Sequence, residues 1–222
     1  EAVVTTRQKD LGVAVVNIGS ATTSLVIFEE GDVLHTAVLP IGSGHITSDI
    51  AIGLRTSIEI AEDVKLAYGT VNPSEFAKKD QFKLSEFGGE DEESYSKKFV
   101  AEIARAEEIF EKVDEELARV DRSGMLPAGL ILTGGGSKVP GIIDLAKKSM
   151  RLPASVGKPM GITSVVDQAK DPAFSTAIGL ALWGYSIQSV QGGGKFGKLF
   201  GGVKQFDKVG SGIVKLFKSL KP

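Results

Sequence analysis

The sequence predicts an α/β fold in which a mixed sheet carries helices on its faces. Residues 11–18 are almost continuously apolar and lie between charged residues and Gly19, which is typical of a strand buried on both sides. Residues 130–133 form a second apolar run, which leads through three glycines to a helix beginning near Pro140. Between them, apolar residues recur at helical spacing over residues 95–120. Strands and helices in this irregular order indicate a mixed sheet.

The composition limits the classes of protein that need be considered. A chain of 222 residues with 42% hydrophobic content can bury the core of one domain or of two small lobes. The absence of cysteine excludes disulfides and thiolate metal sites, and two histidines leave little for a histidine-rich metal centre. No run approaches the roughly 20 apolar residues of a spanning helix, and residues 1–10 lack the order of a signal peptide. We expect residues 1–10 to be the end of a longer preceding segment, so that the chain is a fragment.

The net charge of −2 conceals two parts of opposite sign. Residues 186–222 contain seven lysines and one acidic residue, Asp207, a net charge of +6 that leaves −8 on residues 1–185. An acidic body argues against nucleic-acid binding, and a basic tail favours an anionic surface as its partner.

The first half of the chain predicts three strands and two helices. Residues 11–18, 24–29 and 33–40 are separated by short turns, which predicts strands in hairpin succession. Helical spacing follows over residues 47–54, with Thr47, Ser48 and Asp49 available to cap the first amides. A second helix begins after Thr56 or Ser57 and stops at Gly69.

The second half predicts longer helices. Residues 70–92 are irregular and acidic, typical of a solvated loop or a small hairpin. We expect one long helix over residues 95–120, packed on the sheet or, as the alternative, in an intermolecular coiled coil. A short strand over residues 154–156 and an apolar helix over residues 175–185, closing the body, complete the prediction.

Two glycine-centred turns carry the candidate chemistry. Residues 17–23 turn tightly through small and hydroxyl side chains, so successive backbone amides can point at an anion, although many ordinary hairpins look the same. Residues 133–141 place three glycines between a strand and a helix, which allows close backbone approach and free amides, or a turn with no ligand. The second turn has neither the Walker spacing nor a dinucleotide fingerprint.

Glu62 and Lys65 are three residues apart on one face of the helix over residues 58–68. As a surface ion pair they would contribute under about 1 kcal/mol. As a pair bracketing ribose hydroxyls and an adenine edge they would supply an acceptor and a donor. The spacing leaves both interpretations open.

The order of these motifs resembles the second half of the actin and heat-shock chaperone (ribonuclease H-like) ATPase superfamily, and within it the FtsA family of bacterial cell-division proteins. The resemblance rests on GVAVVNIGSATTSLVIFEEGDVLHTAVLPIGSGHITSDIA, AEDVKLAYG and GLILTGGGSKVPGI, and it covers roughly residues 1–185. It implies subdomain IIA over residues 1–51 and 126–186 and the smaller subdomain IIB over residues 52–125. The first phosphate loop and a partner-binding subdomain would lie in a preceding half.

The resemblance also implies ATP and Mg²⁺ as cofactors, both needing that preceding half. The second phosphate loop would be Gly19, Ser20, Ala21, Thr22 and Thr23. Glu62 and Lys65 would meet the ribose and the base. The residues flanking the adenosine would be Gly134, Gly135, Gly136 and Lys138.

The phosphate turn departs from the superfamily pattern Asp-Ile-Gly-Gly-Gly-Thr-Thr-Asp. Asn17 and Ser24 replace the two aspartates, and Ser20 and Ala21 replace two glycines. Because a neutral amide is a poorer ligand for a hard cation, Asn17 would meet magnesium only indirectly. We infer weak or absent hydrolysis, with no catalytic residue assigned and nucleotide acting as an assembly ligand.

The C-terminal segment predicts a membrane-binding helix. Residues 187–195 form a glycine-rich flexible linker, and in residues 196–222 large apolar residues recur at helical spacing with lysines between them. Alternatives are a helix docked on the body, or a tail that binds a protein groove or nucleic acid. The residues expected at the lipid interface are Phe196, Lys198, Leu199, Phe200, Val203, Phe206, Ile213, Leu216, Phe217 and Leu220.

The resemblance therefore implies a polymerising adaptor that anchors the tubulin-like FtsZ ring to the cytoplasmic face of the membrane at the division site. Two other functions stay open. One is a sugar or acetate kinase of the same superfamily, and the other is a PilM-like pilus-assembly scaffold. The basic tail weighs against both.

Overall fold

A computed structural model describes residues 2–77, 79–89, 92–103, 106–162 and 167–190. The chain divides into two compact units. The larger is Val4–Gly157, and the other combines Glu1–Val3 with Lys158–Pro222. The predicted tail, residues 196–222, lies outside the described residues.

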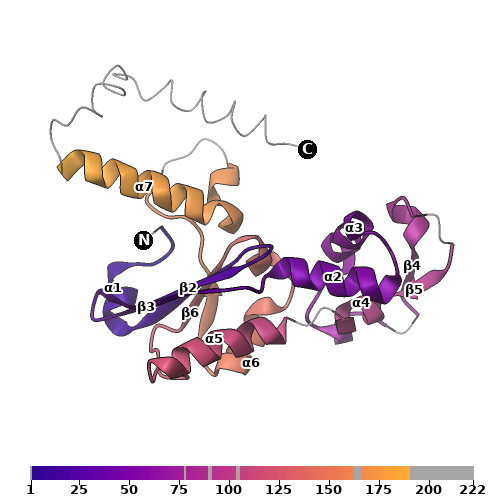
Figure 1. Ribbon diagram of the computed structural model, residues 1–222, viewed down its shortest axis with the longest axis horizontal. Coiled ribbons are helices and arrows are strands. Elements are labelled where there is room, and N and C mark those ends of the chain that lie inside the picture. Colours follow the sequence, from indigo (N-terminus) through magenta and orange to yellow (C-terminus); the bar gives the residue numbers. More distant parts are fainter. Residues whose placement is uncertain (1, 78, 90–91, 104–105, 163–166, 191–222) are drawn as a thin grey trace, which may run out of the picture. The chain divides into compact units, whose positions relative to one another are not determined.

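The larger unit is built on a five-stranded mixed sheet of order β3-β2-β1-β6-β7 (Figure 1). β1, β2 and β3 are successive antiparallel neighbours, and β1, β6 and β7 run parallel. The hairpin succession and the mixed sheet predicted from the sequence are confirmed. The strands are Val13–Ile18 (β1), Thr23–Glu29 (β2), Asp32–Leu39 (β3), Leu130–Thr133 (β6) and Ala154–Val156 (β7).

The middle of the sheet holds the most buried strands. In β1 the side chains of Val13, Ala14, Val16 and Ile18 are fully buried, which explains the continuous apolar run. At the edge, β3 alternates and leaves Val38 68% exposed. Burial therefore falls from the centre of the sheet to this edge.

The parallel pairing of β1 with β6 positions the two glycine turns. The register joins Ala14 to Leu130 and Asn17 to Thr133, so both strands end at the same edge of the sheet. Each strand runs directly into its turn there, and a Cβ on Gly134 would lie 2.3 Å from the Asn17 Oδ1 atom. The two turns are consequently neighbours, although more than a hundred residues separate them in the sequence.

One long helix over residues 95–120 was the wrong prediction. The structure has strand β5 (Ser94–Ser96), helix α4 (Lys97–Ile103) and helix α5 (Glu107–Arg119). The apolar stripe is shared between two packing surfaces. Helix α4 contacts α2 (Ser43–Leu54) and α3 (Ile58–Tyr68), whereas α5 contacts α6 (Ile142–Met150) and β3. Pairing of β5 with β4 (Gln81–Lys83) overrides the helical pattern at its start.

Helices α5 and α6 lie side by side along the sheet (Figure 1). The α5 stripe buries Phe110, Val113 and Leu117 completely, as the helical spacing predicts. Helix α6 (Ile142–Met150) begins within two residues of the predicted start and buries Ala146. Because α5 packs on the sheet, part of the predicted subdomain IIB contacts IIA. The subdomain boundaries stay a prediction.

Helices α2 (Ser43–Leu54) and α3 (Ile58–Tyr68) pack with α4 and the β4–β5 hairpin. A small hairpin was one of the two structures expected for residues 70–92, but the observed hairpin extends beyond them to Ser96. Its Phe82 ring packs at a tilt against that of Tyr68, with centroids 5.0 Å apart. Short 3₁₀ turns Pro73–Glu75 (η1) and Leu84–Phe87 (η2) complete this region. Ser57 caps α3 by accepting from the Ile60 amide, and Gly69 ends it, as predicted.

Helix α2 begins at Ser43, four residues before the predicted start. Its first amides are satisfied by neighbouring backbone carbonyls and not by Thr47, Ser48 or Asp49. The imidazole Nδ1 of His45 accepts from the Gly42 amide at 3.1 Å. Helix α1 (Thr6–Leu11), with a capping box between Thr5 and Gln8, was not predicted.

The second unit contains 3₁₀ turns Asp167–Lys170 (η4) and Pro172–Phe174 (η5) and helix α7 (Ser175–Val190). The predicted helix over residues 175–185 is present and continues to Val190, so residues 187–190 of the expected linker are helical. That this helix closes the body stays a prediction. None of the helices in the described part of the chain is long and apolar enough to cross a membrane.

Shortening a valine to alanine will lower the free energy of unfolding more at the centre of the sheet than at its edge. Val16→Ala empties a fully buried site in β1, and we expect it to lower the free energy of unfolding by about 2 kcal/mol. Val38→Ala, at a site 68% exposed, is the matched control and will change it by under about 0.5 kcal/mol. Urea unfolding measures both, and equal losses would contradict the assignment of β1 to the centre of the core.

Candidate functional site

A cavity of about 300 Å³ lies where the two glycine turns approach helix α3. It brings together three groups that the sequence singled out: Ser20 of the first turn, Glu62 and Lys65 of α3, and Gly135, Gly136 and Lys138 of the second turn. Their roles toward a ligand stay a prediction. The rest of its lining is Ser43, Leu66, Gly69, Val139 and Pro140.

Not every predicted residue reaches this cavity. Gly19, Ala21, Thr22, Thr23 and Gly134 shape the turns but do not line it. The Thr23 hydroxyl is fully buried and has no hydrogen-bond partner among the described residues. A buried hydroxyl without a hydrogen-bond partner lowers the stability of a fold by about 1–3 kcal/mol.

A larger cavity of about 580 Å³ lies elsewhere, beside α4 and α5. Its lining includes four glutamates and one lysine, and the lysine ammonium is already paired with Glu115 at 2.8 Å. A polyphosphate would be repelled by that lining. Of these two cavities, the smaller is therefore the better candidate for an anionic ligand. The four glutamates are Glu102, Glu107, Glu108 and Glu111.

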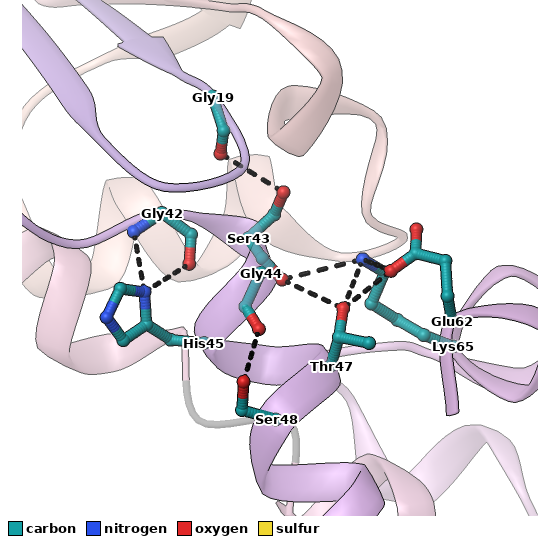
Figure 2. Close-up of polar contacts among 9 residues, drawn as sticks. All are labelled: Gly19, Gly42, Ser43, Gly44, His45, Thr47, Ser48, Glu62 and Lys65. Carbon is teal, nitrogen blue, oxygen red and sulfur yellow. Dashed lines mark hydrogen bonds and ion pairs between the residues drawn. The ribbon is translucent and has the colours of Figure 1, made fainter. Parts of the chain in front are cut away.

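The first turn is closed by its own backbone and held from outside by α2. The Gly19 amide donates to the Thr22 carbonyl at 2.9 Å, which closes the turn between β1 and β2. The amides of Ser43 and Gly44 donate to the carbonyls of Gly19 and Ser20 at 2.9 and 2.8 Å. The Ser43 hydroxyl also donates to the Gly19 carbonyl, at 3.1 Å (Figure 2). The first amides of α2 are therefore used to hold the turn.

This contact requires glycine at residue 42. A Cβ there would lie 2.4 Å from the Ser20 carbonyl oxygen and 2.6 Å from that of Gly19, distances that backbone cannot accommodate without moving. The bracing of the turn by α2 was missed in the sequence. The signal was available in the Gly-Ser-Gly sequence at residues 42–44, where small residues allow two backbones to touch.

The second turn follows β6 and continues into the 3₁₀ turn Gly135–Lys138 (η3). Gly134 has a φ of 83°, which favours glycine, and the Ser137 hydroxyl donates to its carbonyl at 2.7 Å. Gly136 packs against Ile18 of β1, whereas Gly135 is exposed with open space where a Cβ would be. Exposed Lys138 adds a positive charge at the rim of the cavity.

Glu62 and Lys65 form more than a surface ion pair. The Lys65 ammonium lies 2.6 Å from the Glu62 Oε2 atom, and the Lys65 side chain is only 9% exposed whereas that of Glu62 is 44% exposed. Thr47 of α2, itself 3% exposed, donates to the same Oε2 atom at 2.6 Å (Figure 2). The sequence placed Glu62 and Lys65 together but gave Thr47 no role beyond a helix cap.

The pKa of Glu62 is held below its ordinary value. Burial of the carboxyl raises the pKa, but the hydrogen bonds from Lys65 and Thr47, with the charge of Lys65, lower it by more. Glu62 is therefore an ionised acceptor at neutral pH.

The cavity suits an anionic ligand that also carries hydroxyl groups. Its lining includes glycine backbone, Lys138 and the side chain of Glu62. The residues do not fit a magnesium ion held by the protein. Among the described residues no group of three His, Cys, Asp or Glu side chains could hold a metal, and Asn17, which has polar contacts of its own, would offer one amide oxygen.

Comparison with known proteins identifies the family of the chain. A family model described as "Cell division protein FtsA" matches residues 14–179. The chain belongs to the FtsA family. The FtsA of Pseudomonas aeruginosa is 36% identical over 190 residues, covering 85% of this chain and 46% of that protein. The FtsA of Bacillus subtilis is 35% identical over 187 residues, covering 83% and 41%. The chain spans about half the length of these curated relatives.

Solved structures show that this FtsA-family chain has the actin-like ATPase fold, as predicted. MreB5 of Spiroplasma citri bound to ADP matches with a TM-score of 0.63 at 19% identity, covering 84% of this chain and 57% of that chain. A chain of the PilM–PilN type IV pilus biogenesis complex matches with a TM-score of 0.61 at 22% identity, covering 81% and 47%. At these identities the likeness concerns the fold alone.

Gly42→Ala tests the bracing of the first turn. The added Cβ collides with the backbone of Ser20, so we expect the free energy of unfolding to fall by about 2 kcal/mol. Gly135→Ala is the matched control for stability, since its Cβ enters open space. Thermal or urea unfolding distinguishes them, and a Gly42→Ala protein as stable as Gly135→Ala would refute the contact.

Glu62→Gln will change stability in a pH-dependent way. The pKa of Glu62 is lower in the folded state than its ordinary value of 4.5. Ionised Glu62 therefore stabilises the fold above pH 4.5, and this stabilisation is lost as the pH falls through the pKa of the folded state. At pH 7 we expect the variant to be less stable by at most about 1 kcal/mol, since the side chain is partly exposed. The difference measured by urea unfolding should shrink below pH 4.5; a difference constant from pH 7 to pH 3 would exclude this cause.

Proposed function

We propose that the intact protein is an ATP-binding, actin-like cell-division protein that polymerises on the cytoplasmic face of the membrane and anchors FtsZ there. The observation that carries this proposal is that both glycine turns and Glu62 line the same cavity, in a chain of the FtsA family. The parallel pairing of β1 with β6 brings the two turns to one edge of the sheet, and the Val71 amide, just after α3, donates to the Pro140 carbonyl at 3.1 Å.

The proposed nucleotide lies with its phosphates toward Gly19–Thr23, its ribose beside Glu62 and Lys65, and its adenosine along Gly134–Gly136 with Lys138. Small residues at both turns let the ligand approach the backbone closely. The solved MreB5 structures bound to ADP and to AMPPNP support a nucleotide as ligand of this fold. The remaining walls of the cleft belong to the part of the relatives that this chain does not match.

Slow hydrolysis is part of the proposal. Asn17 stands where a carboxylate would help to hold magnesium and its waters, so any Mg²⁺ would be held mainly through the phosphates of the nucleotide. ATP then acts chiefly as a ligand that favours one conformation or one assembly state.

The C-terminal segment would attach the protein to the membrane. Its seven lysines can each contribute about 1 kcal/mol near an anionic leaflet, and its spaced phenylalanines and leucines supply the apolar side of an interfacial helix. Attachment of this kind suits an adaptor that recruits FtsZ and self-associates along one leaflet. A PilM-like scaffold or a kinase is less well supported, because the family match over residues 14–179 is to FtsA and the PilM–PilN likeness is one of fold.

Co-sedimentation with vesicles tests the adaptor function. We expect the intact protein to bind phosphatidylglycerol vesicles and to carry FtsZ into the pellet, whereas a variant lacking residues 195–222 will do neither. Neutral phosphatidylcholine vesicles are the control, since the lysines gain little there. Equal binding of both proteins to anionic vesicles would reject the tail as the anchor, and a pellet without FtsZ would reject the adaptor function.

A further inference from the structure

Strand β3 is the longest strand of the five-stranded sheet and lies at its edge, beside β2. In an antiparallel strand, successive residues point their amide and carbonyl groups alternately to one side and to the other. About half of these groups in β3 therefore point away from β2. Among the strands of the described residues, none pairs with this outer edge. The edge can accept a further strand.

The devices that usually prevent edge pairing are missing from most of β3. Exposed edge strands are commonly very short or are interrupted by lysine or proline. β3 has eight residues and no lysine, and Pro40 follows only after its last residue. A shift in register between Ile27 and Phe28 of β2 affects only the start of β3, and His35–Leu39 pairs regularly. This regular stretch is long enough to pair on its other side as well.

The side chains of β3 alternate between a covered face and an open face. His35 faces helix α5, where its Nε2 atom lies 2.8 Å from the Glu116 Oε2 atom. On the open face Leu34 and Val38 are 43% and 68% exposed, and the exposed residue between them is Thr36. The open face thus carries two apolar side chains, placed symmetrically about a threonine.

We propose that β3 is a self-association surface, at which two copies of the protein pair their β3 strands antiparallel about a twofold axis through Thr36. An axis perpendicular to the sheet keeps equivalent residues of the two copies on the same face. A residue can then pair only with one whose number differs from its own by an even amount. With the axis at Thr36, Leu34 of each copy lies opposite Val38 of the other, and the two sheets become one.

The two neighbouring registers are less favourable. An axis one residue earlier sets Val38 opposite Asp32 of the second copy, an apolar side chain against a carboxylate. An axis one residue later sets Leu34 opposite Pro40, which has no amide to donate. Apolar cross-strand pairs stabilise an antiparallel sheet, so the axis at Thr36, which forms two of them, is favoured.

This two-copy contact goes beyond the proposed function. An isologous pair closes on itself and is therefore a different contact from the one that would extend a polymer. It uses no residue of the cavity and none of the C-terminal segment, and so requires neither nucleotide nor membrane.

Cysteine cross-linking of the intact protein tests both the surface and its register. Directly opposite residues of an antiparallel pair have Cα atoms about 4.5–5.5 Å apart, within the range of a disulfide. Thr36→Cys lies on the axis, so we expect a covalent dimer under mild oxidation, with neither nucleotide nor vesicles present. Val38→Cys should not cross-link to itself, because the two equivalent positions would be about 14 Å apart. A mixture of Leu34→Cys and Val38→Cys proteins should form the mixed dimer.

Each outcome of the cross-linking decides for or against the pairing. The wild-type protein is the control for any cysteine outside this chain, which itself has none. Equal cross-linking of Thr36→Cys and Val38→Cys would indicate random collision and would overturn the proposal. No cross-linking of Thr36→Cys would mean that the edge is free or is covered by another part of the intact protein, and would overturn it too. Neither result bears on the proposed function, because nucleotide and vesicles are absent.

A charge on the edge provides a second measurement. Lysine on an edge strand disfavours pairing, so we expect Val38→Lys to raise the dissociation constant of the dimer roughly tenfold or more in sedimentation equilibrium. Val156→Lys, at a valine 37% exposed on the opposite edge strand β7, is the matched control and should change it by less than about twofold. Urea unfolding checks that both variants are folded. A monomeric wild-type protein, or equal dissociation constants for the two variants, would overturn the proposal.

Discussion

The parallel pairing of β1 with β6 is the constraint on which the candidate site depends. It joins Asn17 to Thr133, so two glycine turns more than a hundred residues apart leave the sheet at one edge. The pairing is stabilised by the complete burial of Val16 and Leu132 and by the packing of Gly136 on Ile18. A change in that core would therefore reach the site through the register of the strands.

Helix α2 is the second element that the site requires, and it works through its first turn. Helix N-terminal amides usually need a capping side chain or an anion. Here two of them are consumed by the carbonyls of Gly19 and Ser20, so α2 braces the turn and is not itself a site for phosphate. The close approach is possible because Gly42 has no side chain. The rigidity of the turn thus depends on a residue more than twenty positions away.

The sequence was sufficient for the central strands, the hairpins and the identity of most cavity-lining residues. Apolar runs bounded by glycine identified β1 and β6 because strands buried on both faces need no alternation. The helical stripe over residues 95–120 misled because its two halves bury against different partners, and periodicity cannot show which surface a residue faces. Thr47 was assigned to a helix cap for a similar reason: its hydroxyl is satisfied by Glu62 and Lys65, and this depends on how α2 packs against α3.

The network that holds the site lies within one compact unit. Every bond that joins the first turn, α2 and α3 connects residues of Val4–Gly157, so the turn and the carboxylate are held in place by hydrogen bonds of the protein itself. Preorganisation lowers the entropy cost of binding. Under the proposed function, the nucleotide would then meet a turn and a carboxylate that are already held by the protein's own hydrogen bonds, which suits a ligand that favours one conformation or assembly state.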